Sequence, residues 1–488
     1  MADAHSGLHI ALGVSRRVLL GLWVFGLVVH TGWALTIPEP MDWDPAYYRT
    51  VARHIADGDG AVVGALWRLL WIPERLPYPA DLHWMPIPSR VLVPGVWLWH
   101  AHGDQVTTVA VAALWGPMAA LFAAKLGAST RGAVAAGVLG ALGLCYARFL
   151  STPDCIAIYG LLGSLAFLEV ARGHAGRAGL LGAMAALTRN DGFLLSPCLA
   201  VGVRSPPAAL AVAIAGPLAS LAWHLRNASI AGPAYWAARA ATANVLESAD
   251  LVQLSIGGVA PITFTDRLNF LLTEGFETSL LIWLVALPLP SVALWLRSER
   301  WMRAVQAFWL FMPVVSQFMA PGVSSSGSVF RSAAALFPVA CGVTAVVGSN
   351  LGAWGARTRG YPPWFLPSVL GGGLVVGSFA LVLQQTKNPS PLPPEVCREL
   401  EQIPAGEPVL SVHPLLLEAH CNRPAVLFVR GMSANQLADL SARFHVRYAL
   451  VMPEDDGYKP SPRRSDAELL LPGWTALTPR LFAAPPAP

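Results

Sequence analysis

Two aspartates stand directly after the first long apolar run, in the stretch EPMDWDPAYYRTVARHIADGDG. Carboxylates two residues apart, such as Asp42 and Asp44, can hold a divalent cation, or one of them can accept a proton beside the other. We therefore interpret both as candidate catalytic residues and as candidate ligands of Mg²⁺ or Mn²⁺. A structural role is the alternative for Asp44, because Asp44 followed by Pro45 also fits the start of a helix that ends at Gly58.

Further candidates lie later in the chain. His83 and Trp84 stand between prolines in PADLHWMPIPSR, within the same polar loop, and are candidate substrate-binding residues. A lone histidine is more often a surface residue, and its nearness in sequence to the aspartate pair is what favours a role in binding. Asp154 is a third substrate-binding candidate at the start of an apolar helix, where an acidic group also complements the helix dipole.

Charged residues also interrupt the apolar runs. Arg189 and Asp191 lie between two such runs, Arg226 and Asn227 end another, and Arg331 begins one. Charges at such depth are costly unless they are paired or face a cavity, so all are candidate substrate-binding residues; the alternative is that Arg189 and Asp191 neutralise each other. Arginine suits a phosphate because its planar group binds two oxygens at once. Together with the carboxylates, these residues indicate a site for an anionic lipid and a base-catalysed transfer.

The composition indicates which elements position these residues. Of 488 residues, 54% are hydrophobic and 13% are charged, and the mean hydropathy is +0.50. Soluble proteins carry about 25% charged residues. The apolar residues occur in blocks of about 20, as bilayer-crossing helices require, so we predict a multi-pass α-helical membrane protein. The net charge of +4 is small and spread over the loops, which gives no indication of a nucleic-acid partner.

Basic residues fall in alternate links between the apolar runs, which orients the chain. The pattern predicts about eleven transmembrane helices, a cytoplasmic N-terminus and an extracytoplasmic C-terminus. The first run is too long for a signal peptide and lacks a cleavage site, so we interpret it as a retained helix. The fifth and sixth runs are short and could instead form a broken hairpin. The expected spans are 17–37, 104–125, 132–150, 153–171, 178–190, 192–203, 207–224, 268–296, 302–320, 330–349 and 363–384.

The pattern divides the chain into two domains. We predict a transmembrane domain over residues 1–385, with a first outer loop over 38–103 that includes an interfacial helix. After the proline-rich linker, short β-branched runs alternate with helical patterns, which predicts a small extracytoplasmic α/β domain over 386–488. Two cysteines of this part, Cys397 and Cys421, would pair as a disulfide if the domain lies outside the cell.

The order of these pieces resembles the GT-C superfamily of membrane glycosyltransferases, of the mannosyltransferase and aminoarabinose transferase type. These enzymes take sugars from polyprenyl-phosphate donors outside the cytoplasmic face. The resemblance extends over roughly residues 15–385, and the order of the motifs carries it better than any single motif. The matching pieces are DWDPAYYRTVARHIADGDG, HWMPIPSRVLVP, LGAMAALTRNDGFLLSP, AWHLRNASIAGPAYW and GSVFRSAAALFPVA.

The resemblance implies roles for particular residues. The catalytic first-loop aspartate of the family falls on Asp44, its later basic residue on Arg189, and its Arg-Asn pair on Arg226 and Asn227. Many relatives have a second acid after the first, where this chain has Pro45. The implied activity is that of a hexosyl or pentosyl transferase in the bacterial inner membrane. Its donor would be a polyprenyl-phosphate sugar, its acceptor an envelope lipid, glycan or protein, and a divalent metal is a candidate cofactor.

Two other functions fit parts of the pattern. A transporter or flippase of lipid-linked sugars would use the same arginines, although it would not need carboxylates in the first outer loop. Such folds often contain internal repeats with broken helices at matching positions, and the sequence shows only one interrupted pair. An inactive scaffold of the same fold is the other alternative, and Pro45 in place of an acid supports it. The large polar loop and the outer domain favour an enzyme.

Overall fold

The computed structural model describes most of the chain. The described residues are 14–37, 43–67, 71–242, 263–270, 299–319, 329–369, 371–373, 375–376, 392, 394–428, 432–451 and 473–485. Asp42 lies outside them, as do most residues of the expected span 268–296 and residues 370, 374 and 377–384 of the expected span 363–384.

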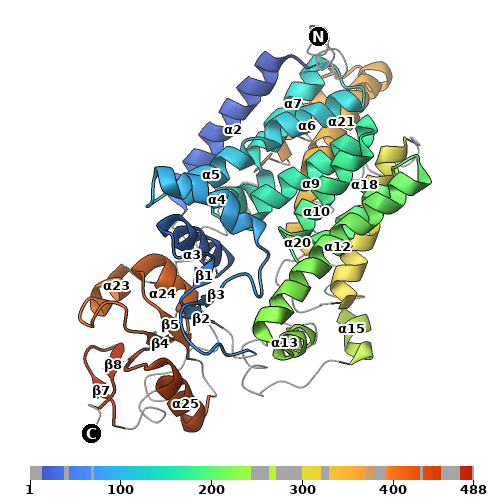
Figure 1. The fold of residues 1–488 in the computed structure, drawn as a ribbon. Coiled ribbons are helices and arrows are strands. Elements are labelled where there is room, and N and C mark those ends of the chain that lie inside the picture. Colours follow the sequence, from blue (N-terminus) through green and yellow to red (C-terminus); the bar gives the residue numbers. More distant parts are fainter. Residues whose placement is uncertain are drawn as a thin grey trace, which may run out of the picture.

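Long apolar helices form the larger part of the molecule (Figure 1). Among the described residues, 6 helices are long and apolar enough to cross a membrane, and the chain is an integral membrane protein. These 6 helices match expected spans, and some of them consist of consecutive helical segments. They are α2 (Arg16–Thr36), α5 and α6 (Gly103–Ala112 and Trp115–Lys125), α7, η1 and α8 (Thr130–Leu142, Leu144–Tyr146 and Ala147–Leu150), α9 (Cys155–Arg172), α12 (Pro206–Ala231), and α20, η5 and α21 (Val329–Ala333, Ala334–Leu336 and Phe337–Arg359).

Shorter helices fill the remaining positions. The fifth and sixth expected spans are α10 (Ala175–Ala186) and α11 (Leu195–Ala200), joined through the 3₁₀ helix η2 (Gly192–Leu194). Neither reaches the length of the spanning helices, which agrees with the broken-hairpin alternative. The expected interfacial helix is α4 (Ile87–Leu98), which leaves Trp97 and Leu98 largely exposed. Three more described helices are α13 (Ala234–Thr242), α15 (Phe264–Phe270) and α18 (Arg300–Met319).

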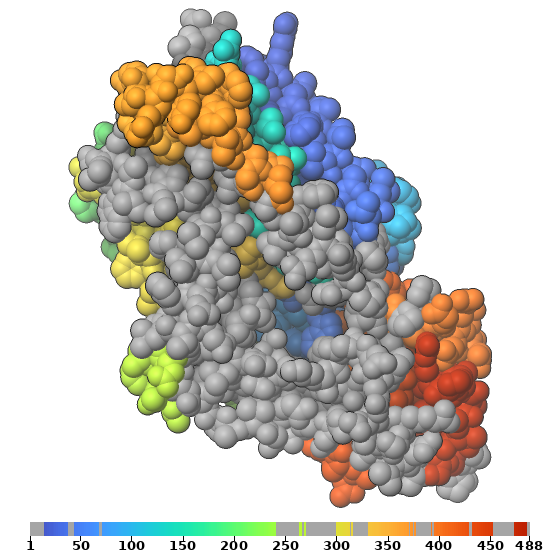
Figure 2. Space-filling model, turned by 180° about the vertical axis from the view of Figure 1, so that it is seen from behind, coloured from blue at the N-terminus to red at the C-terminus, as the bar shows by residue number. Residues whose placement is uncertain are grey.

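Small residues let the helices approach closely. A Cβ added to Gly140 of α7 would lie 2.8 Å from the backbone oxygen of Trp115 on α6. Glycine and alanine at such crossings allow backbone-to-backbone packing in a membrane, where apolar burial between helices gives little driving force. We call the membrane-spanning helices together the helical layer. Seen from the other side, α2 follows one edge of the helical layer, and the C-terminal part lies beyond its far end (Figure 2).

The C-terminal part contains a six-stranded sheet in the order β2-β5-β4-β6-β8-β7. Its strands β4 (Val409–Ser411), β5 (Ala425–Leu427) and β6 (Tyr448–Leu450) lie where the sequence indicates strands. β2 (Ala65–Leu66) comes instead from the first loop and pairs with β5 in parallel. The loop and the C-terminal part therefore share one sheet and lie on the same side of the membrane. β7 (Thr475–Ala476) and β8 (Leu481–Ala483) complete the sheet as antiparallel strands.

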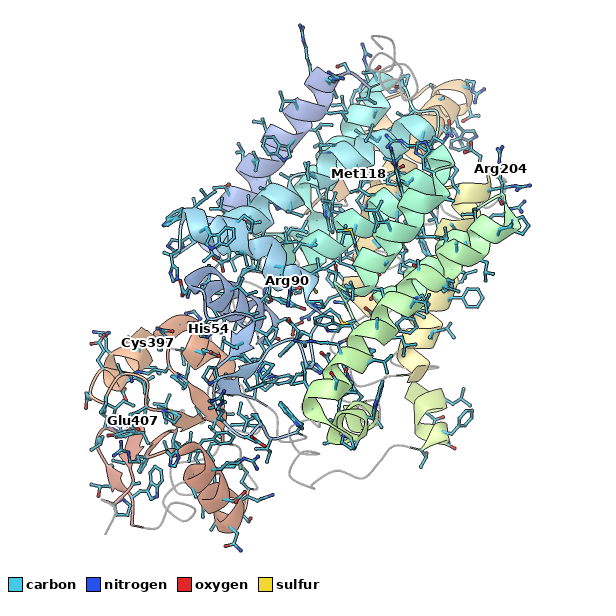
Figure 3. The ribbon with its side chains drawn as sticks, in the orientation of Figure 1. His54, Arg90, Met118, Arg204, Cys397 and Glu407 are labelled. Carbon is cyan, nitrogen blue, oxygen red and sulfur yellow. A yellow bond between two sulfur atoms is a disulfide. The ribbon has the colours of Figure 1, made fainter. Side chains whose placement is uncertain are left out.

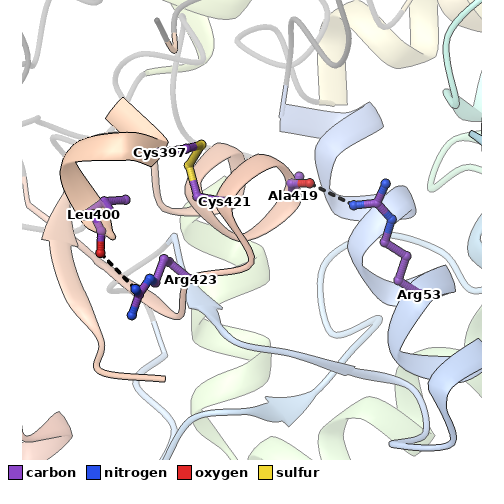
Figure 4. The surroundings of a disulfide bond; sticks show 6 residues. All are labelled: Arg53, Cys397, Leu400, Ala419, Cys421 and Arg423. Carbon is purple, nitrogen blue, oxygen red and sulfur yellow. Dashed lines mark hydrogen bonds between the residues drawn. A yellow bond between two sulfur atoms is a disulfide. The ribbon is translucent and has the colours of Figure 1, made fainter. Parts of the chain in front are cut away.

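Three helices flank this sheet. α25 (Ala434–Phe444) begins after Ser433, whose side chain accepts a hydrogen bond from the Gln436 backbone in a capping box. α23 (Pro394–Leu400) and α24 (Pro414–Cys421) are joined by a disulfide between Cys397 and Cys421 (Figure 4). We call residues 394–485 with β2 the C-terminal unit.

Candidate active site

Asp44 lies in the first turn of α3 (Trp43–Asp57), so it is not the helix cap that was the structural alternative. The helix begins one residue earlier, and Pro45 fits there because the first helical amides need no intrahelical partner. Arg49 is buried in an ion pair with Asp104, because α3 packs between α4 and α24.

Both carboxylate oxygens of Asp44 accept hydrogen bonds. Trp84 Nε1 donates to Oδ1 at 2.9 Å, and Arg331 of α20 forms an ion pair with Oδ2. The side chain of Asp44 is 20% exposed and that of Arg331 is 16% exposed. The structure therefore brings together three of the predicted site residues, from the first loop and from a helix 287 positions later in the chain.

Arg189 and Asp191 form a second pair beside the first. Arg189 donates from Nε to one Asp191 oxygen at 3.0 Å and from Nη2 to the other at 3.2 Å, which is a bidentate geometry. Ser332, the residue after Arg331, donates its hydroxyl proton to Asp191. The neutralisation alternative thus describes Arg189 and Asp191 correctly, and Ser332 connects them to the helix that carries Arg331. The sequence pattern did not indicate Ser332, since a single serine carries no spacing signal.

Asp154 is buried at the N-terminus of α9. Its Oδ1 accepts a hydrogen bond from the Ile156 amide at 3.2 Å, as a helix cap does. Burial raises the pKa of Asp154, and the nearby negative charge of Asp44 raises it further, whereas the positive charges of Arg331 and Arg189 oppose the shift. Asp154 and Asp44 thus interact with the same guanidinium, that of Arg331.

Arg226 and Asn227 lie elsewhere, against the backbone of the first loop. Asn227 is fully buried and donates to the carbonyl oxygen of Asp81 at 2.8 Å, and Arg226 donates to that of Ala80 at 3.4 Å. Asp81 has a left-handed backbone conformation (φ 67°), and its buried carboxylate accepts from Arg90 at 2.7 Å. Burial raises the pKa of Asp81, and the Arg90 guanidinium opposes this. Arg226 and Asn227 therefore fix the loop that presents Trp84 to Asp44.

His83 is held through its backbone. Its carbonyl oxygen accepts from Asn190 at 3.1 Å and from Arg239 of α13 at 2.9 Å, while its ring packs against Trp67 and Trp84. Arg239 was not among the predicted site residues, and it is one of the side chains that anchor the loop. The only available signal was one arginine in the otherwise apolar helical segment 234–242. Figure 3 shows the side chains between the helical layer and the C-terminal unit, with Arg90 labelled on the helical side.

The described residues do not fit the divalent cation that the aspartate pair suggests. No group of three or more His, Cys, Asp or Glu side chains gathers as metal ligands among them. Asp42 lies outside the described residues, and the Asp44 oxygens face an indole N–H and a guanidinium. A cation there would be repelled by Arg331, so we derive no step through a metal.

Solved structures reveal the fold. Over 97% of this chain and 100% of the other, the chain superposes on ArnT from Cupriavidus metallidurans bound to undecaprenyl phosphate, with a TM-score of 0.58 and 14% identity. The apo state of that protein covers 95% of this chain and 98% of the other, with a TM-score of 0.50 and 14% identity. The chain has the GT-C fold.

Sequence comparison adds no relative. No protein-family model matches the chain, and no curated protein matches it in sequence.

A third solved structure, the oligosaccharyltransferase of Archaeoglobus fulgidus in complex with zinc and sulfate, covers 88% of this chain and 67% of the other, at 13% identity. Its TM-score of 0.36 is too low to support a conclusion. The GT-C fold is thus what the resemblance predicted, and it places Asp44 in a loop that follows the first membrane helix.

Proposed function

We propose that this protein transfers a sugar from a polyprenyl-phosphate donor to an envelope acceptor on the extracytoplasmic side, with Asp44 as the general base. The observation that carries the proposal is the ion pair between Asp44 and Arg331, beside the Arg189–Asp191 pair, in a chain with the GT-C fold. The undecaprenyl phosphate bound to ArnT from Cupriavidus metallidurans supports the donor class.

The proposed chemistry needs a proton acceptor and a site for a phosphate. Asp44 accepts the proton of an acceptor hydroxyl while the oxygen attacks the anomeric carbon of the donor sugar. The bond between that carbon and the phosphate oxygen breaks, and polyprenyl phosphate leaves with the bonding electrons. Positive charge near the leaving oxygen stabilises the negative charge that gathers there. A positioned general base contributes about 10²–10⁴-fold to such a reaction.

The contacts support different roles for the two arginines. Arg189 is bidentate to Asp191, and its charge is already neutralised by that partner. Arg331 shares one oxygen of Asp44 in a partly exposed pair, so an incoming phosphate can compete for it. When Arg331 turns to the phosphate, Oδ2 of Asp44 becomes available to the acceptor hydroxyl. Donor binding would thereby prepare the base for the reaction.

The topology follows from the same proposal. The first loop and the C-terminal unit share a sheet, and the N-terminal end of α2 lies at the opposite end of the helical layer (Figure 1). We place the N-terminus in the cytoplasm and the C-terminal unit outside it, in the bacterial inner membrane, with about eleven crossings in the whole chain. The transferred group would be a hexose or a pentose.

Release of free polyprenyl phosphate tests the proposal directly. Purified protein in lipid would be given radiolabelled polyprenyl-phosphate sugars and envelope acceptors, and wild type would be compared with Asp44→Asn. We expect release by the wild type and about 10²–10⁴-fold less by Asp44→Asn, which keeps the shape of the side chain. Release by Asp44→Asn at the wild-type rate would refute the general base. Donor binding with no release in the wild type would instead favour a transporter.

A further inference from the structure

An aromatic pocket lies beside Trp84, and Asp44 is not part of its lining. Its empty volume is about 580 Å³, a figure that includes open solvent at its mouth. Aromatic side chains form most of its wall. They are Tyr47, Trp67, Trp71, Tyr78, Trp84 and Tyr235. We call this cavity the aromatic pocket.

The walls of the aromatic pocket hold one another in place. The Trp84 ring packs 4.3 Å from the Tyr47 ring and 4.3 Å from the Trp67 ring, measured between centroids, and the Trp71 ring meets the Tyr78 ring at 5.7 Å. Most of these rings are buried, whereas Trp71 is only partly so. A preformed wall of rings loses little conformational freedom when a ligand binds, which favours binding.

Polar groups stand among the rings. Arg239 lines the pocket and donates from Nε to the Tyr235 hydroxyl at 3.2 Å and from Nη2 to the His83 carbonyl oxygen at 2.9 Å. These bonds orient the guanidinium, and among the described residues its Nη1 has no hydrogen-bond partner. Asp81 and His83 also belong to the lining. A ligand with one apolar face and hydrogen-bonding groups on its edge matches this combination.

The position of the pocket argues against a lipid tail as its ligand. The walls come from Tyr47 of α3, from β1 (Val62–Val63), from β3 (Tyr78–Pro79), from the loop 80–84, and from the region where α12 ends and α13 follows. Trp67 and Trp71 complete them. Only Ala231, the last residue of α12, belongs to a membrane-spanning helix. Apart from Ala231, the lining thus lies outside the membrane-spanning helices, which favours a ligand with polar groups over an alkyl chain.

We propose that the aromatic pocket is a saccharide subsite, which binds a sugar ring of the acceptor by stacking its C–H face on the aromatic wall. A sugar ring presents apolar C–H bonds on its face and hydroxyls on its edge, and so it complements both the rings and Arg239. Trp84 lines the pocket with its ring and donates its N–H to Asp44 at 2.9 Å. Trp84 therefore belongs both to the wall of the aromatic pocket and to the contacts of Asp44. The acceptor assignment rests on the proposed function, whereas saccharide binding does not.

Saturation-transfer NMR on the purified full chain tests the subsite, with the methyl glycosides of glucose, galactose, mannose and arabinose as probes. We expect transfer to the ring protons of at least one glycoside with the wild type, and loss of that signal in Trp71→Ala. The signal should persist in Trp71→Phe, which keeps a stacking face, and in Trp354→Ala, which removes an exposed tryptophan of α21. Persistence in Trp71→Phe also shows that the site tolerates change and still folds.

Three results would overturn the subsite. They are no transfer to any glycoside of the panel, equal signals in the wild type and Trp71→Ala, and displacement of the glycoside by undecaprenyl phosphate, which would assign the pocket to the lipid. In the transfer assay, Trp71→Ala should raise the KM for the acceptor about tenfold and leave the KM for the donor unchanged. Glycoside binding without any sugar transfer would reject the proposed function and keep the saccharide site. Transfer with glycoside signals unaffected by Trp71→Ala would reject the saccharide site alone.

Discussion

Asp44→Asn should bind polyprenyl phosphate more tightly than the wild type, although it loses transfer. In the ligand-free protein the guanidinium of Arg331 is paired with Asp44, so a phosphate has to break that pair before it can use the same group. Asparagine keeps an oxygen for the Trp84 N–H and removes the charge that holds Arg331. Donor affinity and catalytic activity should therefore change in opposite directions.

The size of the effect follows from exposure. The paired side chains of Asp44 and Arg331 are 20% and 16% exposed, and ion pairs in contact with solvent contribute about 0.2–1 kcal/mol. Removing the competitor should lower the Kd for the lipid phosphate by about 2–5-fold. Arg331→Gln should raise that Kd, because an arginine–phosphate hydrogen bond contributes about 1.5–3 kcal/mol. After subtracting the cost of breaking the pair with Asp44, about 0.5–2.8 kcal/mol remains, so the expected increase is roughly 2–100-fold.

Titration of the purified variants with polyprenyl phosphate, followed by calorimetry, measures both effects. Asp57→Asn is the matched control, because Asp57 is an exposed carboxylate at the far end of the same helix. Its Kd should equal that of the wild type. In the double variant with Arg331→Gln, the tightening by Asp44→Asn should vanish, since no guanidinium remains to be released. Weaker binding by Asp44→Asn, or an unchanged Kd in Arg331→Gln, would refute the competition between carboxylate and phosphate.

Three further predictions concern the elements around the site. The carboxylate of Glu418, followed by that of Asp59, raises the pKa of His54 from 6.5 to about 9, so the stabilisation by charged His54 is complete below pH 6.5 and is lost as the pH rises through about 9. Protease cleavage within α3 and α24 should therefore increase above pH 9, and Glu418→Gln should weaken this pH dependence, since only Asp59 would then raise the pKa of His54. Cys421→Ser should lower the free energy of unfolding by about 3.5 kcal/mol, because the disulfide closes a loop of 24 residues; a melting temperature equal to that of the wild type would contradict this. Asn227→Ala should cost about 1–2 kcal/mol in thermal unfolding and slow transfer, because it releases the loop that presents Trp84 to Asp44; unchanged transfer would show that the loop needs no such anchor.

Local patterns predicted the membrane-length helices and three of the six strands of the sheet. Apolar runs of about 20 residues mark α2, α9 and α12, and β-branched runs mark β4, β5 and β6, because burial in lipid or in a parallel sheet imposes those compositions. Strand β2 was not predicted from the sequence. It is two residues long, and its partner β5 lies 360 positions later, so no local pattern distinguishes it from a loop.

The candidate site was predictable in its residue types and not in its pairings. Asp44 and Arg331 stood out as charges beside apolar runs, yet their contact joins residues 287 positions apart and depends on how the helices pack. Arg226 and Asn227 resembled ligand-binding residues equally well. Their partners are backbone carbonyl oxygens of Ala80 and Asp81, which every residue has, so the sequence holds no mark of that role.

Helix α3 connects the C-terminal unit to the base. Its first turn carries Asp44, and its later turns contact α24, where Arg53 donates to the Ala419 carbonyl oxygen at 3.0 Å and His54 contacts Glu418 at 3.1 Å (Figures 3 and 4). Ten residues of helix between Asp44 and His54 span about 15 Å as a stiff rod. A displacement of α24 would therefore move the carboxylate as well. Since a misplacement of about 1 Å can cost 10²-fold in rate, we expect the C-terminal unit to affect transfer through the position of the proposed base.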